Sequence, residues 1–134
     1  MDMIDHVSIA VRDLAAASKF YQAVLATIGY ARLVVRPDTV GFGKKYPEFW
    51  LNHRPAMPKV AADSGAHVCL RARGAEAVDA FHRAALSAGA TCDGPPGPRP
   101  EYAAGYYAAF IRDGDGNRIE AVTFVEPGGA SIPG

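Results

Sequence analysis

The sequence predicts an α+β fold built from two tandem βαβββ modules, and three observations support this prediction. The segment Asp5-His6-Val7-Ser8 matches Ala66-His67-Val68-Cys69, an offset of 61 residues, from 6 to 67. A helical pattern follows each copy in the same register, so that Phe20 aligns with Phe81. Three short strand-like segments then follow each helical pattern. A repeat of this length is one supersecondary unit used twice, so the two histidines are expected at equivalent positions.

The first module begins with a strand over Ile4–Val11, in which alternation places His6 and Ser8 on one face and apolar residues on the other. Asp13 is a suitable N-cap for the helical pattern that follows, and Gly29 is a suitable stop. Turn residues separate the remaining three predicted strands, at about Ala31–Arg36, Thr39–Gly43 and Glu48–His53.

A linker from Pro55 to Gly65 leads to the second module. Its predicted elements, in order, are a strand at His67–Arg71, a helix at about Ala75–Ala88, a short strand at Ala90–Asp93, a loop at Gly94–Pro100, and strands at Tyr106–Arg112 and Arg118–Phe124. We expect one domain over residues 1–125, with modules at about 3–54 and 66–125. Residues 126–134 are expected to form a flexible tail.

Composition excludes several classes of protein. Fourteen basic and fourteen acidic residues cancel, so no net positive charge favours nucleic acid or anionic membrane. No apolar run approaches the roughly 18 residues of a membrane span, and the N-terminus lacks a secretory pattern. With only Cys69 and Cys92, a disulfide framework is not expected, and we expect a cytoplasmic protein with reduced thiols.

Three side chains with metal-binding chemistry are expected on the strand faces that point away from the helices. His6 and His67 occupy the repeat-equivalent position, and Glu120 has the matching parity in the last strand. They can meet if the two sheets curl around a shared cavity. Two imidazoles and one carboxylate can hold a divalent metal and leave positions open for substrate.

The chain resembles the vicinal oxygen chelate superfamily, which includes glyoxalase I, bleomycin-resistance proteins, fosfomycin-resistance enzymes and extradiol dioxygenases. The resemblance is carried by Asp5–Leu14, Phe20-Tyr21, His67-Val68 and Asp113–Ala121. It implies two βαβββ modules that form an incomplete barrel around a metal, with His6, His67 and Glu120 as ligands. The metal would be zinc, nickel, manganese or iron, and the small-molecule substrate would chelate it through two oxygens.

The fourth strand departs from the four-ligand pattern of glyoxalase I. The internal repeat places Trp50, not Glu48, opposite Glu120. Glu48 lies two residues earlier on the same face and is a candidate for a displaced fourth ligand or a catalytic group. Trp50 is expected to form a wall of the pocket.

Several further residues are candidates for the substrate pocket. Ser8 and Cys69 share the faces of the two histidines. Arg99 and three tyrosines could supply a carboxylate clamp and phenolic hydrogen bonds. The tyrosines are Tyr102, Tyr106 and Tyr107. The alternative for Tyr106 and Tyr107 is an ordinary strand pair, one facing inward and one outward.

Two functions of different classes follow from these expectations. The first is a metal-dependent enzyme with isomerase, lyase or ring-cleaving dioxygenase chemistry. The alternative is a protein of the bleomycin-resistance type that binds a drug or metabolite without chemistry. An open half-barrel of 14.2 kDa leaves sheet edge to cover, so we expect a homodimer. The site would lie either within one chain or between two, with His6 from one chain and His67 and Glu120 from the other.

Overall fold

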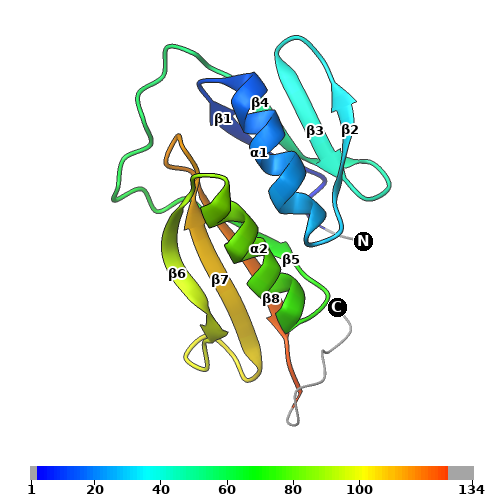
Figure 1. Cartoon of the computed structure of the whole chain (residues 1–134), viewed down its shortest axis with the longest axis vertical. Coiled ribbons are helices and arrows are strands. Elements are labelled where there is room, and N and C mark those ends of the chain that lie inside the picture. The colour runs from blue at the N-terminus through cyan, green and yellow to red at the C-terminus, as the bar shows by residue number, and fades with distance from the viewer. Residues whose placement is uncertain (1–2, 127–134) are drawn as a thin grey trace.

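The structure is a computed structural model that describes residues 3–126, and it contains two four-stranded mixed sheets with one helix each (Figure 1). The first set of elements is β1 (Val7–Val11), α1 (Leu14–Ala26), β2 (Ala31–Val35), β3 (Thr39–Gly43) and β4 (Pro47–His53). The second is β5 (Val68–Arg71), α2 (Ala75–Ser87), β6 (Thr91–Pro98), β7 (Tyr106–Arg112) and β8 (Arg118–Phe124). The predicted α+β fold of two βαβββ units is therefore confirmed, and within residues 3–126 the sheets do not close into a barrel.

The two sheets have the same topology, in the orders β1-β4-β3-β2 and β5-β8-β7-β6. The parallel pair β1–β4 places Ser8 beside Trp50, and the parallel pair β5–β8 places Cys69 beside Glu120. Trp50 is thus the structural counterpart of Glu120, as the repeat predicts. Strands β1 and β5 each lie at one edge of their sheet.

Local sequence signals set the ends of both helices. The carboxylate of Asp13 accepts a hydrogen bond from the backbone N–H of Ala16 at 3.0 Å, which caps α1. Gly29 and Gly89 have φ values of 89° and 100°, a left-handed conformation that glycine adopts without steric cost. Both glycines follow their helices closely, as predicted.

Strand β6 is longer than the sequence predicts, because it runs to Pro98 through the segment expected to be a loop. Its pairing with β7 shifts register between Cys92 and Gly94, and again between Gly94 and Gly97. These irregularities accommodate prolines, which lack a backbone donor, on a strand at the edge of the sheet.

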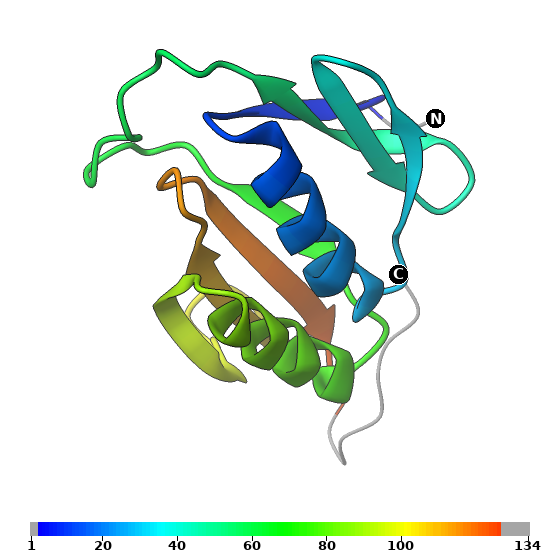
Figure 2. The same ribbon diagram turned by 45° about the horizontal axis from the view of Figure 1, so that its top comes forward.

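Each helix lies on one face of its own sheet and the two helices contact each other, so that one hydrophobic core joins the two modules (Figure 2). Tyr21 of α1 contacts Phe49 of β4, with ring centroids 5.3 Å apart. Phe81 of α2 belongs to the same buried cluster. Because the helices cover only one face of each sheet, the opposite faces are free to carry a site.

A set of polar contacts, here called the clasp, ties the β7–β8 turn to the first module. The hydroxyl of Tyr21 donates to Asp113 at 2.6 Å, and Arg12 donates to Asp115 at 2.8 Å. The side-chain amide of Asn117 donates to the carbonyl of Ala10 at 2.9 Å. The clasp fixes the position of one module relative to the other.

Two further expectations concern the C-terminal tail and membrane-spanning helices. Apart from Glu126, the predicted tail lies outside the described residues. No helix within residues 3–126 is both long enough and apolar enough to cross a bilayer.

Candidate functional site

Glu120 lies at the centre of a polar cluster on the open face of the second sheet. Glu120 is only 2% exposed, although acidic side chains are normally solvated by water. The Nε2 atom of His67 lies 2.9 Å from one carboxylate oxygen, and the hydroxyl of Tyr106 donates to the other. The pairing of β8 with β5 and β7 brings these three side chains together.

Cys69 and Tyr106 complete this cluster and are held in their protonated forms. Burial, followed by the negative charge of Glu120, raises the pKa of the Cys69 thiol to about 12. Burial and the hydrogen bond to Glu120 raise the pKa of Tyr106 well above its ordinary value. Both groups are therefore protonated at neutral pH in the metal-free chain.

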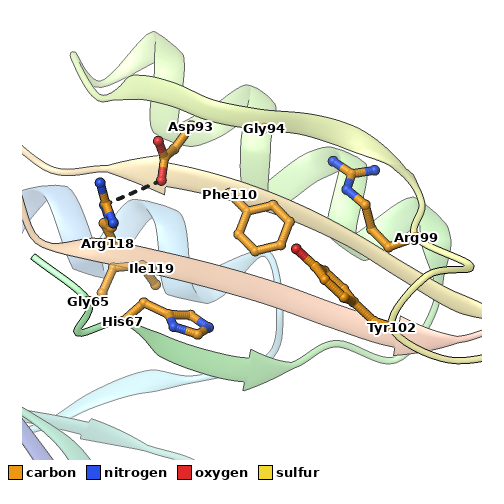
Figure 3. A pocket seen from close by; sticks show the side chains of 9 residues that line it. All are labelled: Gly65, His67, Asp93, Gly94, Arg99, Tyr102, Phe110, Arg118 and Ile119. Carbon is orange, nitrogen blue, oxygen red and sulfur yellow. Dashed lines mark ion pairs between the residues drawn. The ribbon is translucent and has the colours of Figure 1, made fainter. Parts of the chain in front are cut away.

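A cavity of about 350 Å³ lies beside the cluster (Figure 3). Its walls come from the segment before β5, from β6, β7 and β8, and from the β6–β7 loop. The lining residues are Gly65, His67, Asp93, Gly94, Arg99, Tyr102, Phe110, Arg118 and Ile119. The volume fits a small organic molecule, and His67 connects the cavity to Glu120.

The two arginines of the cavity have different surroundings. Arg118 lies 3.7 Å from a carboxylate oxygen of Asp93 and donates to the carbonyl of Ser64. Asp93 also pairs with Arg112 at 3.1 Å, so the charge of Arg118 is only partly compensated. Arg99 donates to the backbone carbonyls of Pro95 and Pro98, and its guanidinium lies 5.5 Å from the ring centroid of Phe110. Within residues 3–126, Arg99 has no carboxylate partner, so it remains a fixed positive charge at the cavity wall.

Arg99 and Tyr102 line this cavity, whereas Tyr107 lies on the other side of the sheet. The hydroxyl of Tyr107 donates to Asp79 of α2 at 2.6 Å, which places Tyr107 on the helix side of the sheet. Neighbouring residues of a strand point to opposite faces, so Tyr106 faces Glu120 and Tyr107 cannot line the cavity. Ser8 and Trp50 lie on the other sheet, where the guanidinium of Arg36 stacks on Trp50 at 5.4 Å.

His6 does not join His67 and Glu120 within the chain. Its Nδ1 atom lies 2.8 Å from Asp5, and its side chain is half exposed. In the part of the chain that the structure describes, no three His, Cys, Asp or Glu side chains are close enough to hold one ion. The three-ligand set therefore stays a prediction that a second chain would have to complete.

Glu48 also lies away from Glu120. It is exposed and lines a small cavity with Tyr30 and Leu70, and its negative charge contributes, after burial, to raising the pKa of Tyr30. Its role as a fourth ligand or catalytic group stays a prediction.

Phe110 and Arg118 are site residues that the sequence analysis did not name. Phe110 lies in β7 with the parity of Tyr106, and Arg118 lies in β8 with the parity of Glu120. The boundaries of both strands were predicted to the residue. The same alternation argument therefore contains the signal needed to find them. Asp93 could not be placed in this way, because it lies between Cys92 and Gly94, where the pairing of β6 with β7 shifts register.

His67 and Glu120 fit two positions of a metal site. Two ligand atoms that are each about 2.1 Å from a tetrahedral or octahedral ion are roughly 3.0–3.4 Å apart. The observed 2.9 Å between Nε2 and the carboxylate oxygen is close to this range. An imidazole nitrogen and a carboxylate oxygen also suit zinc, nickel, manganese and iron.

Comparison with known proteins agrees with the fold. The family model for the Glyoxalase/Bleomycin resistance protein/Dioxygenase superfamily matches residues 3–121. A glyoxalase/bleomycin resistance protein from Albidiferax ferrireducens is 32% identical, with a TM-score of 0.79, and the match covers 90% of this chain and 98% of that one. No curated protein matches.

Two more distant structures share the fold. A glyoxalase/bleomycin resistance protein/dioxygenase family enzyme from Burkholderia phytofirmans is 24% identical, with a TM-score of 0.67 and coverage of 88% and 95%. A fosfomycin resistance protein from Listeria monocytogenes is 15% identical, with a TM-score of 0.66 and coverage of 91% and 93%. The chain belongs to the Glyoxalase/Bleomycin resistance protein/Dioxygenase superfamily.

Proposed function

We propose that the protein is a divalent-metal-dependent enzyme whose small substrate binds the metal through two oxygens. The observation that supports this most is the buried carboxylate of Glu120, 2% exposed, with the Nε2 atom of His67 at 2.9 Å. A carboxylate is costly to bury unless it is paired or binds a metal. When bound, the metal would act as a Lewis acid for isomerase or lyase chemistry, or would support ring-cleaving oxygenation if it is iron.

We further propose that the third ligand, His6, comes from a second copy of the chain. Strands β1 and β5 are edge strands, and an unpaired sheet edge favours association with another chain. His6 precedes β1 and His67 precedes β5 directly. Pairing β1 of one chain beside β5 of its partner would therefore bring His6 next to the partner's half of the site, twice in a symmetric dimer.

The cavity indicates which substrates the chain's own residues would favour. Arg99 provides a fixed positive charge, and Phe110 and Tyr102 provide aromatic surface. A guanidinium binds carboxylates with paired hydrogen bonds. We therefore expect a substrate that is small, anionic at one end and oxygen-rich at the end near His67.

Metal analysis of protein purified without chelator tests the metal site. We expect one divalent ion per chain in the wild type, and loss of stoichiometric metal in His67→Ala and Glu120→Gln with the fold retained. His53→Ala is the matched control, because His53 lies elsewhere, 3.9 Å from Asp38. Wild-type protein that never binds zinc, nickel, manganese or iron would favour the alternative, a protein that binds an anionic aromatic metabolite without chemistry.

A mixed dimer distinguishes a site between chains from a site within one chain. His6→Ala and His67→Ala chains, each with a different affinity tag, are coexpressed and the mixed dimer is purified through both tags. A site between chains leaves one intact ligand set in this dimer, so about half of the wild-type metal content is expected. A site within one chain leaves no intact set and gives no bound metal.

A further inference from the structure

A thiol and an imidazole meet on the helix side of the second sheet, away from the proposed metal site. Cys92 lies on β6, and the Nε2 atom of His82 on α2 lies 3.2 Å from its sulfur. Strand β6 and helix α2 are neighbours in Figures 1 and 2. The sequence gives no reason to pair these residues, which are ten positions apart in different elements.

The two partners differ in exposure in a way that suits a reactive thiol. His82 is only 9% exposed, so its ring is held in place by the packing of α2 on the sheet. Cys92 is an exposed residue on an edge strand, at the point where the pairing with β7 shifts register. A reagent from solution can therefore reach the sulfur, while the imidazole beside it keeps a fixed position.

The charge that acts on His82 comes from Asp79 of α2, and Asp93, which follows Cys92, pairs with Arg112 at 3.1 Å. Burial lowers the pKa of His82, and the carboxylate of Asp79, one turn earlier in the helix, acts in the opposite direction. The carboxylate of Asp79 also accepts a hydrogen bond from the hydroxyl of Tyr107, which holds the carboxylate on the helix side of the sheet. Burial outweighs the carboxylate, so the pKa of His82 is lowered and the neutral ring is an acceptor for the thiol proton beside the sulfur.

Cys69 provides an internal comparison. Its thiol lies beside the carboxylate of Glu120, and burial and that charge raise its pKa to about 12. A thiol in such surroundings is almost entirely protonated at neutral pH and is therefore a poor nucleophile. The two cysteines of the chain thus have opposite surroundings, one beside an imidazole and one beside a carboxylate.

We propose that Cys92 and His82 form a reactive thiol–imidazole pair, and that Cys92 is a site of S-thiolation by low-molecular-weight disulfides. In the reaction, the imidazole takes the thiol proton and the Cys92 sulfur attacks one sulfur of the small disulfide. A new S–S bond forms as the old one breaks, and the leaving thiolate receives the proton from His82. The products are a mixed disulfide at Cys92 and one free small thiol.

The test is the rate of mixed-disulfide formation with glutathione disulfide, measured on the full-length protein at neutral pH in the absence of oxygen. Peptide mass spectrometry gives the rate at each cysteine separately, and the urea-unfolded chain gives the reference rate of an unperturbed thiol. We expect Cys92 to react about tenfold faster than in the unfolded chain. A Cys92 rate in the folded protein at or below the unfolded rate would overturn the proposal.

The variant His82→Gln tests the role of the imidazole. It keeps a polar side chain of similar reach, and we expect the rate at Cys92 to fall about tenfold while the rate at Cys69 stays low. If the variant unfolds instead, both cysteines will react at the reference rate, and the wild-type comparison of folded and unfolded chains then decides. A folded His82→Gln protein with an unchanged Cys92 rate would show that His82 does not activate the thiol.

Discussion

At the scale of single residues, the buried carboxylate of Glu120 depends on hydrogen bonds with two neighbouring side chains. Its two carboxylate oxygens have different partners, His67 on one side and Tyr106 on the other. The phenol stays protonated, because burial and this hydrogen bond raise its pKa. Tyr106 therefore acts as a permanent donor that orients the carboxylate, and a metal would meet an oxygen whose direction is already set.

Tyr106→Phe removes this donor without changing the shape of the ring. We expect the free energy of unfolding to fall by about 1–3 kcal/mol, because a buried charged acceptor loses its partner. We expect metal affinity to fall about 10- to 100-fold, as for other partners of metal ligands. Denaturant titration and metal titration measure the two effects.

The matched control for that variant is Tyr107→Phe. It deletes a hydroxyl from the adjacent residue, on the opposite face of the same strand, where the partner is Asp79. It should leave metal affinity unchanged. Equal losses of metal affinity in the two variants would contradict the positioning role of Tyr106.

At the scale of elements, helix α1 is fixed by contacts at its start and on its buried face. Asp13 caps its first turn, and Tyr21 reaches across to Asp113 in the β7–β8 turn. Burial raises the pKa of Asp113, while the hydrogen bonds from Tyr21 and Asn117 lower it. The net upward shift means that the charged form of Asp113 weakens the fold relative to the protonated form.

Tyr21→Phe should increase the destabilisation that the charged form of Asp113 causes. Without the phenol, the pKa of Asp113 should rise further. A carboxyl group whose pKa is raised by folding stabilises the fold in its protonated form. This stability is lost as the pH rises through the pKa that the group has in the folded protein. The variant should therefore lose more stability at about pH 7 than at about pH 4. We expect a loss of about 1.5–3 kcal/mol at the higher pH. Urea unfolding at the two pH values measures it.

Tyr30→Phe is the control for that experiment. The hydroxyl of Tyr30 makes a long contact of 3.4 Å with the carbonyl of Arg71 in exposed surroundings. Its removal should change stability by no more than about 0.5 kcal/mol at either pH. A loss in Tyr21→Phe that does not vary with pH would argue against the coupling to Asp113.

The elements also show which parts of the fold can be predicted from the sequence. Alternation and turn residues predict β3, β7 and β8 to the residue, because each is a regular strand inside a sheet. Strand β6 is not predictable in this way, because its bulges interrupt the alternation and its prolines are typical of loops.

For the site, parity places Glu120 on the face of β8 opposite Ile119 and Ala121. It cannot place His6, because the distance between β1 and β5 depends on how the helices pack and on whether a second chain is present. It also cannot decide between Tyr106 and Tyr107 until the side covered by α2 is known.

At the scale of the whole molecule, each helix packs on one face of its own sheet, and β1 and β5 are edge strands. The segment before β1 is apolar and exposed, with Met3 at 94% and Ile4 at 60%. Val35 of β2, at the opposite edge of the same sheet, has a similar exposure of 66%. If β1 meets the partner chain, only the first of these two surfaces is covered in the dimer.

Ile4→Asp should therefore weaken the dimer, because it places a charge in the contact next to β1, whereas Val35→Asp should not. Sedimentation at micromolar concentration should give twice 14.2 kDa for the wild type and for Val35→Asp. It should give a mass closer to one chain for Ile4→Asp. A wild-type protein that remains a single chain at all concentrations would contradict the proposed dimer.

The clasp has a consequence for the order in which the molecule can form. Its contacts join residues 92 to 107 positions apart, so they close long loops and form late in folding. During synthesis the first module leaves the ribosome well before Asp113 exists, and the hydroxyl of Tyr21 must stay hydrated until then. The core around α1 can therefore be completed only after the last hairpin has been made. Pulsed hydrogen exchange during refolding should accordingly show the amides of α1 reaching full protection together with those of β7 and β8.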